Sequence, residues 1–295
     1  MNKRYTQGIA YIVLAYLSWG LLPLFWKYLD DAPAVITLAH RILWSSVFAV
    51  TVCLFMKRDY LRKYFSNPKS LAGLFVTGLL VSINWGVFIY AVNTEQLVEA
   101  SLGYFINPLV CIVLGMVFLG EKLNKAQIAA FLLAMAGVAY LTINYGSFPW
   151  IAMVLALSFG TYGLMKKTMN YDSMGALAVE TTLIAPFALG FLIFKTSDVG
   201  FFVTELPFSV SVMLVLTGVV TAVPLYWFGT AAVRIPLYSI GFFQYIAPSI
   251  KLFIGVFLFK EAFSATHAVS FSLIWAGLAL YICDIVIKLR KVNKM

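Results

Sequence analysis

Runs of about twenty apolar residues follow one another along almost the whole sequence. Each run ends at charged residues, turn residues or proline, and most connections between runs are short. A helix of this length spans the hydrocarbon core of a bilayer, about 30 Å, whereas a membrane strand needs only about ten residues. We expect ten membrane-spanning helices, at residues 8–28, 35–56, 71–92, 98–119, 126–144, 149–169, 174–194, 210–233, 237–259 and 267–287.

The composition agrees with a chain that lies mostly in lipid. It is 62% hydrophobic and only 11% charged, whereas soluble domains are roughly 45–50% apolar and 25% charged. The longest polar connections, 57–70 and 195–207, are too short to form folded domains. We therefore predict an all-α polytopic membrane protein without a soluble catalytic module.

The net charge of +9 could indicate a nucleic-acid partner, but the positions of the charges favour another explanation. With a cytoplasmic N-terminus and ten crossings, three basic residues fall on the outer side: Lys27, Lys195 and Lys260. Sixteen fall on the cytoplasmic side: Lys3, Arg4, Lys57, Arg58, Arg62, Lys63, Lys69, Lys122, Lys125, Lys166, Lys167, Arg234, Lys288, Arg290, Lys291 and Lys294. This distribution follows the positive-inside rule. It predicts that both termini are cytoplasmic and that nucleic acid is not a partner.

The first run and the cysteines suggest neither a leader peptide nor a metal site. The first run is longer than the roughly 7–15 apolar residues of a signal peptide, so we expect it to remain in the protein. Cys53, Cys111 and Cys283 form no Cys-x-x-Cys motif. We therefore expect neither a disulfide nor a bound metal, and we expect no cofactor.

The two halves of the sequence resemble each other at a constant offset of 140 residues. The matching pairs include Ser18 and Ser158, Gly20 and Gly160, Thr77 and Thr217, Gly78 and Gly218, Phe88 and Phe228, Pro108 and Pro248, and Gly137 and Gly277. If each half crosses the membrane five times, the second half enters it upside down. The sequence therefore predicts two inverted five-helix repeats, 1–145 and 146–295.

Inverted repeats are typical of transport proteins. Two similar halves of opposite orientation can exchange conformations, so that a cavity opens first to one side of the membrane and then to the other. Channels for water and ions also contain inverted repeats. The repeat therefore predicts transport and leaves both a carrier and a passive channel open.

Among the prolines inside apolar runs, three are singled out because we expect them to bend helices near the binding site. They are Pro108, its counterpart Pro248, and Pro224. A proline removes one backbone hydrogen bond, which packed membrane helices can tolerate because neighbouring groups satisfy the freed carbonyl. Interruptions at matching positions of two halves indicate a transporter's binding site.

Polar residues share a helical face with these prolines. Tyr104, Asn107, Pro108 and Cys111 follow helical spacing, and the offset moves that face to Gln244, Ala247, Pro248 and Lys251. Lys251 lies near the centre of its run, where its ammonium group reaches neither surface easily. We expect Lys251 to face a cavity, with an ion pair inside the bundle as the alternative.

His40 and Arg41 lie about 10 Å inside the second run. An arginine in hydrocarbon costs at least about 2.5 kcal/mol, so Arg41 either reaches the headgroups, holds a structural partner, anchors an anion or pairs with a carboxylate. Glu180, the counterpart of His40, could supply that carboxylate. Burial disfavours its charged form and a cation favours it, so Glu180 either carries protons or makes a structural hydrogen bond. Our hypothesis is that His40, Arg41 and Glu180 flank one cavity, with Glu180 coupling it to protons.

Other polar and small residues have more than one explanation. Asn84, beside Trp85, bonds either a neighbouring helix or a substrate. Glu95 and Glu99 border the outer entrance, where we expect ordinary loop charges. Small residues in 130–134 and 276–279 allow close helix packing, either as internal scaffold or as the surface of a homodimer; the sequence leaves monomer and dimer open.

Five motifs stand out together: Ala39-His40-Arg41, Asn84-Trp85, the stretch from Ser101 to Pro108, Thr221 to Leu225, and Gln244 to Pro248. In these motifs the sequence resembles the RarD family of the EamA-like branch of the drug/metabolite transporter superfamily. The resemblance implies ten helices in two inverted repeats, a bacterial cytoplasmic membrane, and secondary transport, often export. Family members are often called chloramphenicol-sensitive proteins or permeases, a label that does not establish a substrate.

The sequence thus predicts a carrier that moves a small organic solute through a cavity between the first four and the sixth to ninth helices. The aromatic content of 16%, with Arg41 and Lys251 as anchors, suggests an amphipathic, aromatic or anionic solute. The expected partners are this solute, membrane lipid and protons as a candidate coupling ion. A passive channel is the alternative. An intramembrane enzyme is the rival from another class, but the sequence lacks paired aspartates, His-Glu-x-x-His, Gly-x-Ser-x-Gly and a Walker motif.

Overall fold

The computed structural model describes residues 3–56, 58–199, 207–260 and 263–292, and helices make up nearly all of them. In chain order they are α1 Lys3–Trp26, η1 Lys27–Leu29, α2 Ala34–Met56, α3 Arg58–Phe65, α4 Pro68–Asn93, α5 Leu97–Leu119, α6 Lys125–Tyr145, α7 Trp150–Met169, α8 Ser173–Val199, α9 Phe208–Ala232, α10 Leu237–Gln244, α11 Ile246–Phe253, η2 Ile254–Leu258 and α12 Ala265–Val292. The all-α prediction is confirmed for these residues.

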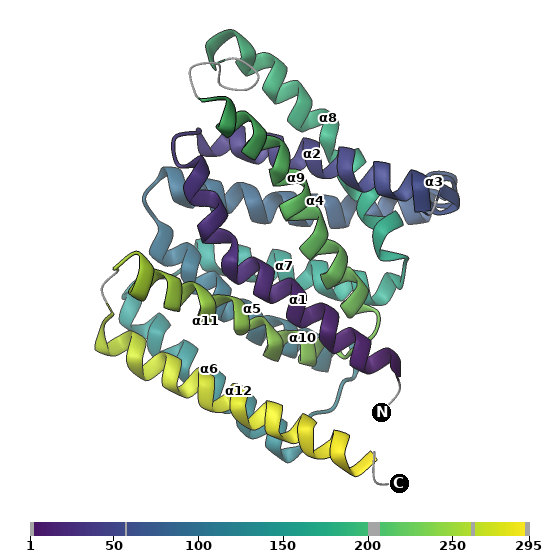
Figure 1. Ribbon diagram of the computed structural model, residues 1–295. Coiled ribbons are helices and arrows are strands. Elements are labelled where there is room, and N and C mark those ends of the chain that lie inside the picture. The colour runs from purple at the N-terminus through teal and green to yellow at the C-terminus, as the bar shows by residue number, and fades with distance from the viewer. Residues whose placement is uncertain (1–2, 57, 200–206, 261–262, 293–295) are drawn as a thin grey trace.

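Nine of the described helical segments are long and apolar enough to cross a membrane, and they coincide with nine of the ten predicted runs. The remaining run is α7, whose last turn carries Lys166 and Lys167 and is therefore less apolar. α1 begins and α12 ends at the same end of the bundle (Figure 1). That arrangement requires an even number of crossings and so favours α7 as another one, although the count of ten stays a prediction.

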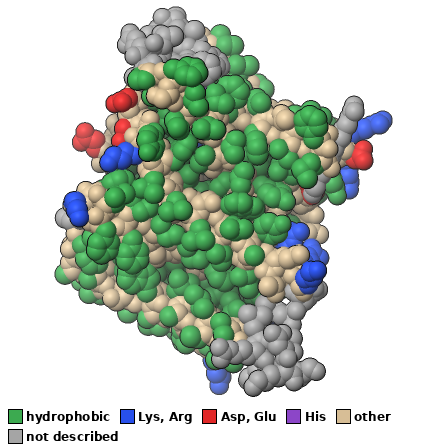
Figure 2. All heavy atoms as spheres, in the orientation of Figure 1, with side chains coloured by type: hydrophobic (Ala, Val, Ile, Leu, Met, Phe, Trp, Pro, Cys, Tyr) green, Lys and Arg blue, Asp and Glu red, His purple; other side chains and the backbone are tan. Residues whose placement is uncertain are grey.

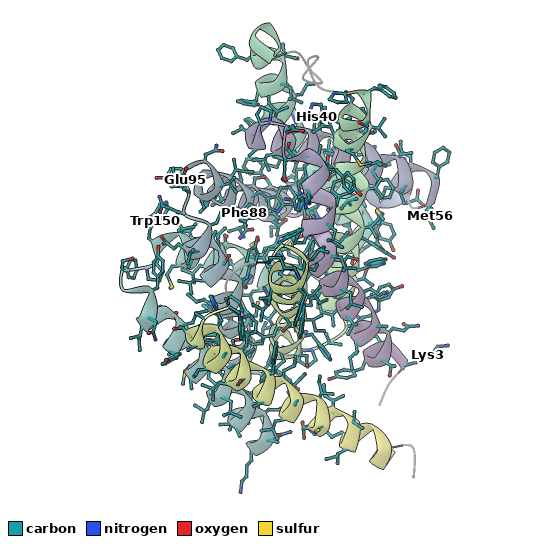
Figure 3. All side chains as sticks on the ribbon, turned by 60° about the vertical axis from the view of Figure 1, so that its left-hand side comes forward. Lys3, His40, Met56, Phe88, Glu95 and Trp150 are labelled. Carbon is teal, nitrogen blue, oxygen red and sulfur yellow. The ribbon has the colours of Figure 1, made fainter. Side chains whose placement is uncertain are left out.

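The two ends of the bundle can be told apart by labelled residues. Lys3 and Met56 lie at one end and Glu95 and Trp150 at the other (Figure 3); we call these the Lys3 end and the Glu95 end. Between them the visible face is mostly hydrophobic, and most visible charged side chains gather near its left and right margins (Figure 2). Such a wide apolar surface would be a liability in water and suits contact with lipid.

Local sequence explains where several helices begin and end. The Asn67 side chain accepts hydrogen bonds from the backbone of Lys69 and Ser70 at the start of α4, directly before a proline. Asn124 and Gln127 form a reciprocal capping box at the start of α6. Gly120 and Gly146 end α5 and α6 in the left-handed conformation, which glycine adopts without steric cost.

Close helix contacts recur at the predicted offset. A Cβ atom on Gly137 would lie 2.7 Å from Ser270 O, and one on Gly277 would lie 2.6 Å from Ala130 O. Because 130 and 270 are themselves counterparts, these are the same contact seen from each half. It joins α6 to α12 and buries Ala130, Ala134 and Gly277, whereas Ala276 and Ala279 are exposed. The buried residues serve as internal scaffold, and a homodimer stays a prediction.

A second pair of contacts shows the same relationship. A Cβ atom on Gly20 would lie 2.8 Å from Ile250 Cβ, and one on Gly160 would lie 2.7 Å from Val110 Cγ1. The hydroxyl of Tyr245 also donates a 3.3 Å hydrogen bond to the carbonyl oxygen of its own counterpart, Phe105. The packing therefore follows the sequence repeat, whereas the division into 1–145 and 146–295 stays a prediction.

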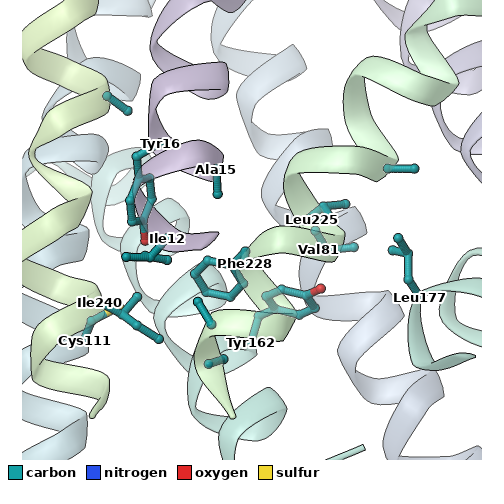
Figure 4. Packing of buried hydrophobic residues seen from close by; sticks show 14 of the residues in the cluster. Ile12, Ala15, Tyr16, Val81, Cys111, Tyr162, Leu177, Leu225, Phe228 and Ile240 are labelled. Atoms are coloured by element: carbon teal, nitrogen blue, oxygen red, sulfur yellow. The ribbon is translucent and has the colours of Figure 1, made fainter. Parts of the chain in front are cut away.

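Aromatic rings fill the space where α1, α7 and α9 meet. Tyr162 and Phe228 stack with their centroids 5.8 Å apart, and Tyr16 meets Phe228 edge-on (Figure 4). Trp19 packs against Phe228 and Phe159 in the same group. These rings form the hydrophobic centre around which the polar groups described below are arranged.

The three prolines have different effects on their helices. The chain breaks between α10 and α11 at Tyr245, three residues before Pro248, and then forms the π-helix η2. α5 and α9 instead continue through Pro108 and Pro224. Among the described helices, the interruption expected in both halves is therefore present only in the second, because a proline within a helix does not by itself end it when its neighbours are packed.

Candidate functional site

Arg41 points into the bundle rather than toward the headgroups. Its Nε donates a 2.7 Å hydrogen bond to Thr221 Oγ1 on α9. Its guanidinium carbon lies 4.2 Å from the ring centroid of Trp85 and 5.4 Å from that of Trp26. Each such cation–π contact stabilises by about 0.5–2 kcal/mol, which offsets part of the cost of placing an arginine at this depth.

Lys251 occupies a similar position on the other side of the same region. Its Nζ lies 3.9 Å from the ring centroid of Tyr104. Phe88, three residues after Trp85 on α4, packs against Tyr104 with the ring centroids 6.2 Å apart. We call Arg41, Trp85, Tyr104 and Lys251 the cation–aromatic cluster.

The cluster lies at one depth in the bundle. Arg41 is seven residues after the start of α2, Tyr104 seven after the start of α5, and Lys251 seven before the end of η2. At 1.5 Å per residue, all three lie about 10 Å from the Glu95 end. Four residues singled out in the sequence, from the four helices α2, α4, α5 and α11, are thus brought together.

The cations of the cluster have no acidic partner among the described residues. The ion pairs there involve Lys166, Lys167 and Lys288, not Arg41 or Lys251. Lys251 makes no hydrogen bond to a described residue, and Arg41 uses only its Nε. The expected alternative of an ion pair for Lys251 is therefore not found in this part of the chain.

Glu180 pairs with a residue that sequence reasoning did not single out. Lys166 Nζ lies 2.7 and 2.9 Å from the two carboxylate oxygens, and Thr77 Oγ1 donates to Oε1 at 2.6 Å. The Lys166 and Glu180 side chains are only 6% and 2% exposed. The carboxylate that we expected near Arg41 is therefore neutralised elsewhere, seven residues from the start of α8.

Lys166 was overlooked because a lysine at the end of an apolar run looks like a charge that sets membrane orientation. A signal was present nonetheless. A glutamate inside an apolar run needs a cation, and Lys166 ends the neighbouring run. Burial of its side chain beneath the helix end could be seen only once the helices were placed.

Two pockets lie on either side of the Lys166–Glu180 pair. One has an empty volume of about 220 Å³ and is lined by Leu74, Lys166 and Ser173 among others. The other, of about 300 Å³, is lined by residues that include Gly78, Glu180 and Trp85. Along α4 the order is therefore the 220 Å³ pocket, the buried ion pair, the 300 Å³ pocket and the cation–aromatic cluster.

The remaining predicted residues mostly link helices. His40 is fully buried and accepts a 3.1 Å hydrogen bond from Trp44 Nε1 on its own helix. Asn84 donates to Leu155 O at 2.8 Å and to Ser158 Oγ at 3.1 Å, which joins α4 to α7. Of the two explanations given for Asn84, the structure supports the bond to a neighbouring helix.

Asn107 and Gln244 meet at Cys111. The thiol donates to Asn107 Oδ1 at 3.5 Å and to Gln244 Oε1 at 3.7 Å. Gln244 and Cys111 are the counterparts of Tyr104 and Lys251. The charged contact of the cluster therefore has a neutral equivalent in the same molecule.

Glu99 corrects another expectation. It is 4% exposed, and its carboxylate accepts hydrogen bonds from Ile151 N at 2.7 Å and Tyr145 Oη at 3.1 Å. It therefore caps the start of α7 instead of being an ordinary loop charge, whereas Glu95 is exposed. Among the described residues, no three His, Cys, Asp or Glu side chains lie together as metal ligands.

Comparisons with known proteins agree with this architecture. The model of the EamA-like transporter family matches residues 6–143. The uncharacterized transporter YojE of Bacillus subtilis is 46% identical over 286 residues, 93% of each chain, and protein RarD of Escherichia coli is 37% identical over 293 residues, 99% of each. A crystal structure with 19% sequence identity superposes with a TM-score of 0.72, covering 94% of this chain and 97% of its own, which shows a shared fold.

Proposed function

Because the chain belongs to the RarD group of the EamA-like transporter family and is a multi-pass membrane transporter, we propose that it is a secondary carrier. It moves a small organic solute by alternating access between its two halves. The solute passes along α4, through the 220 Å³ and 300 Å³ pockets and past the cation–aromatic cluster. The Lys3 end, which the positive-inside rule assigns to the cytoplasm, is the side from which the solute is exported.

One observation favours a carrier over a passive channel. The two pockets are separated by the direct contact of Lys166 with Glu180, and beyond the 300 Å³ pocket Arg41 rests on Trp85. A channel needs a continuous path for its solute, whereas a carrier closes its path on at least one side at any time. Two closures at different depths fit a carrier.

Proton coupling is part of this proposal. Glu180 lines the 300 Å³ pocket, and its charge holds Lys166 in the contact that separates the pockets. A proton on Glu180 would remove that attraction and release the closure near the Lys3 end. Intramembrane carboxylates serve as proton carriers in many transporters.

The experiment is counterflow in proteoliposomes with a panel of labelled aromatic solutes of different charge, including benzoate and chloramphenicol. A carrier accelerates uptake of at least one solute when the same unlabelled solute is present inside. Flux that ignores the solute on the far side would identify a channel, and chemically altered solute would identify an enzyme.

The same vesicles test proton coupling. Glu180→Gln removes the titratable group while keeping its shape, so uptake driven by a pH gradient should fall to the level of uptake without a gradient. Counterflow, which needs no gradient, should persist. If pH-driven uptake by Glu180→Gln equals that of the unaltered protein, Glu180 is not the coupling residue.

A further inference from the structure

We propose that Arg41 and Lys251 together bind the anionic group of the solute, so that the substrate is a small organic anion with a flat apolar body. This inference rests on the proposed carrier function and names its substrate class. It starts from the cation–aromatic cluster, where two positive charges face one region within the membrane-spanning helices.

The two cations have unused hydrogen-bonding capacity. Arg41 donates only through Nε, to Thr221, which leaves the four N–H groups of its two terminal nitrogens without a partner among the described residues. Lys251 contacts the face of Tyr104 and has no hydrogen-bond acceptor in the described part of the chain. A guanidinium and an ammonium in this state suit a carboxylate, which accepts several charge-assisted hydrogen bonds.

Electrostatics also favours a bound anion. Arg41 and Lys251 are like charges at the same depth in the bundle, and no described acidic residue pairs with either. Contact with an aromatic face offsets only part of the cost of removing a cation from water. An anion between the two charges would turn this repulsion into two attractions, which is a large gain where water is scarce.

The counterpart positions show that packing alone does not require these charges. The residues related to Arg41 and Lys251 by the offset are Thr181 and Cys111, both neutral and buried. Thr181 donates to Leu177 O at 2.8 Å, and Cys111 donates to Asn107. The same helix arrangement is therefore built once with cations and once without them.

The position of the two cations suits alternating access. Arg41 lies on α2 in the first half, and Lys251 lies on α11 in the second, six residues beyond the break at Tyr245. One anion bound to both would join the two halves. Its binding energy would then depend on how the halves are arranged, which is what a carrier's substrate must achieve.

The neighbourhood restricts the rest of the solute. Trp85 belongs to the cluster and also lines the 300 Å³ pocket, together with the apolar side chains of Ile42, Val81 and Leu225. Ligand sites are mostly lined by apolar and aromatic side chains of this kind. We therefore expect the part of the solute beside Trp85 to be flat and apolar.

The test measures binding to the purified full-length chain in a nonionic detergent. Benzoate and benzamide, which share shape but differ in charge, are the probes, with indole-3-acetate and indole-3-acetamide as a second matched pair. The carboxylates should raise the melting temperature in a concentration-dependent manner, and the amides should leave it unchanged. Equal stabilisation by acid and amide would overturn the proposal without any variant.

Variants then locate the site. Arg41→Gln and Lys251→Met should each weaken benzoate binding at least about tenfold, because each removes one charged partner of a buried contact. The Arg41→Lys variant should lose less benzoate affinity than Arg41→Gln, since lysine keeps the positive charge. Arg234→Gln is the matched control, because Arg234 also lies on an aromatic ring, 5.5 Å from the Tyr11 centroid, near the end of α9; it should bind benzoate normally.

Two outcomes contradict the site. Variants that remain monodisperse, melt like the unaltered protein and bind benzoate with unchanged affinity would exclude Arg41 and Lys251. Stabilisation by added phosphatidylglycerol but by no soluble carboxylate would assign the cluster to a lipid headgroup. If Arg41→Gln and Lys251→Met do not fold, the acid–amide comparison on the unaltered chain still decides whether an anion is bound.

Binding and transport can fail separately. Benzoate that binds but shows no counterflow would argue against the carrier function and leave the anion site in place. Counterflow of a neutral or cationic solute, without any binding of carboxylates, would support the carrier and reject the anion.

Discussion

The two halves of the molecule are packed alike but charged differently. Gly137 and Gly277 make equivalent close contacts with a neighbouring helix, and Gly20 and Gly160 form a second equivalent pair. In contrast, the buried pair of Lys166 and Glu180 has Trp26 and His40 as counterparts, and the charged residues Arg41 and Lys251 have Thr181 and Cys111. Repetition thus preserves shape, which the fold needs twice, whereas these four charges are not repeated.

This contrast separates the close helix contacts, which both halves share, from the buried charges, which only one member of each counterpart pair carries. The Lys166–Glu180 pair lies near the Lys3 end, and the cation–aromatic cluster lies near the Glu95 end. In the proposed pathway each end would therefore have its own type of closure, one an ion pair and the other a cation on an aromatic ring.

The largest expected effect comes from breaking the buried ion pair. Lys166→Met leaves the Glu180 carboxylate buried without a cation, which should lower the free energy of unfolding by about 3–5 kcal/mol. Trp26→Met at the counterpart position leaves no charge behind and should cost less. Denaturation of the purified protein, followed by circular dichroism, measures both.

The double variant Lys166→Met with Glu180→Met is the control. Replacing both members of a buried pair by apolar residues is often neutral, so most of the lost stability should return. If Lys166→Met lowers the free energy of unfolding no more than Trp26→Met does, the buried ion pair contributes no more to stability than the tryptophan at the counterpart position.

A smaller effect should distinguish Gly78 from Gly218, which are counterparts with different surroundings. A Cβ atom at Gly218 would overlap the backbone of Trp44, whereas one at Gly78 would lie 3.1 Å from Glu180 O and Ile184 Cγ1. Gly218→Ala should therefore cost about 2–3 kcal/mol of stability, and Gly78→Ala about 1 kcal/mol or less. Melting temperatures of the two variants, measured side by side, test the difference.

Gly137 and Gly277 provide the symmetric comparison. An added Cβ would meet a backbone oxygen at 2.7 Å in one case and at 2.6 Å in the other. Gly137→Ala and Gly277→Ala should therefore lower stability equally, to within about 0.5 kcal/mol. Unequal losses of stability in Gly137→Ala and Gly277→Ala, or equal losses in Gly78→Ala and Gly218→Ala, would contradict these predictions. The two halves would then not share their helix contacts in the way described above.

The sequence predicted the helices, the close packing of small residues in α6 and α12, and the importance of Arg41, Tyr104 and Lys251. These follow from apolar periodicity, the offset and the cost of charges in lipid, which can be read along the chain. Three features could not be read in this way. The partner of Glu180, the burial of Glu99 and the break at Tyr245 depend on which groups meet after folding. A lysine at a helix end and a glutamate in a loop look solvated until the neighbouring helix is placed.

The smallest expected effect concerns the link between α4 and α7. Asn84 donates to Leu155 O and Ser158 Oγ, whereas its counterpart in the second half is Pro224, which has no side-chain donor. Hydrogen bonds between membrane helices contribute about 0.6 kcal/mol on average and at most about 1.7 kcal/mol. Asn84→Ala should therefore lower unfolding free energy by about that amount and leave benzoate binding unchanged, because the side chain already has its partners within the protein. Loss of binding with unchanged stability would instead place Asn84 on the solute pathway and make this contact another position where the halves differ in function.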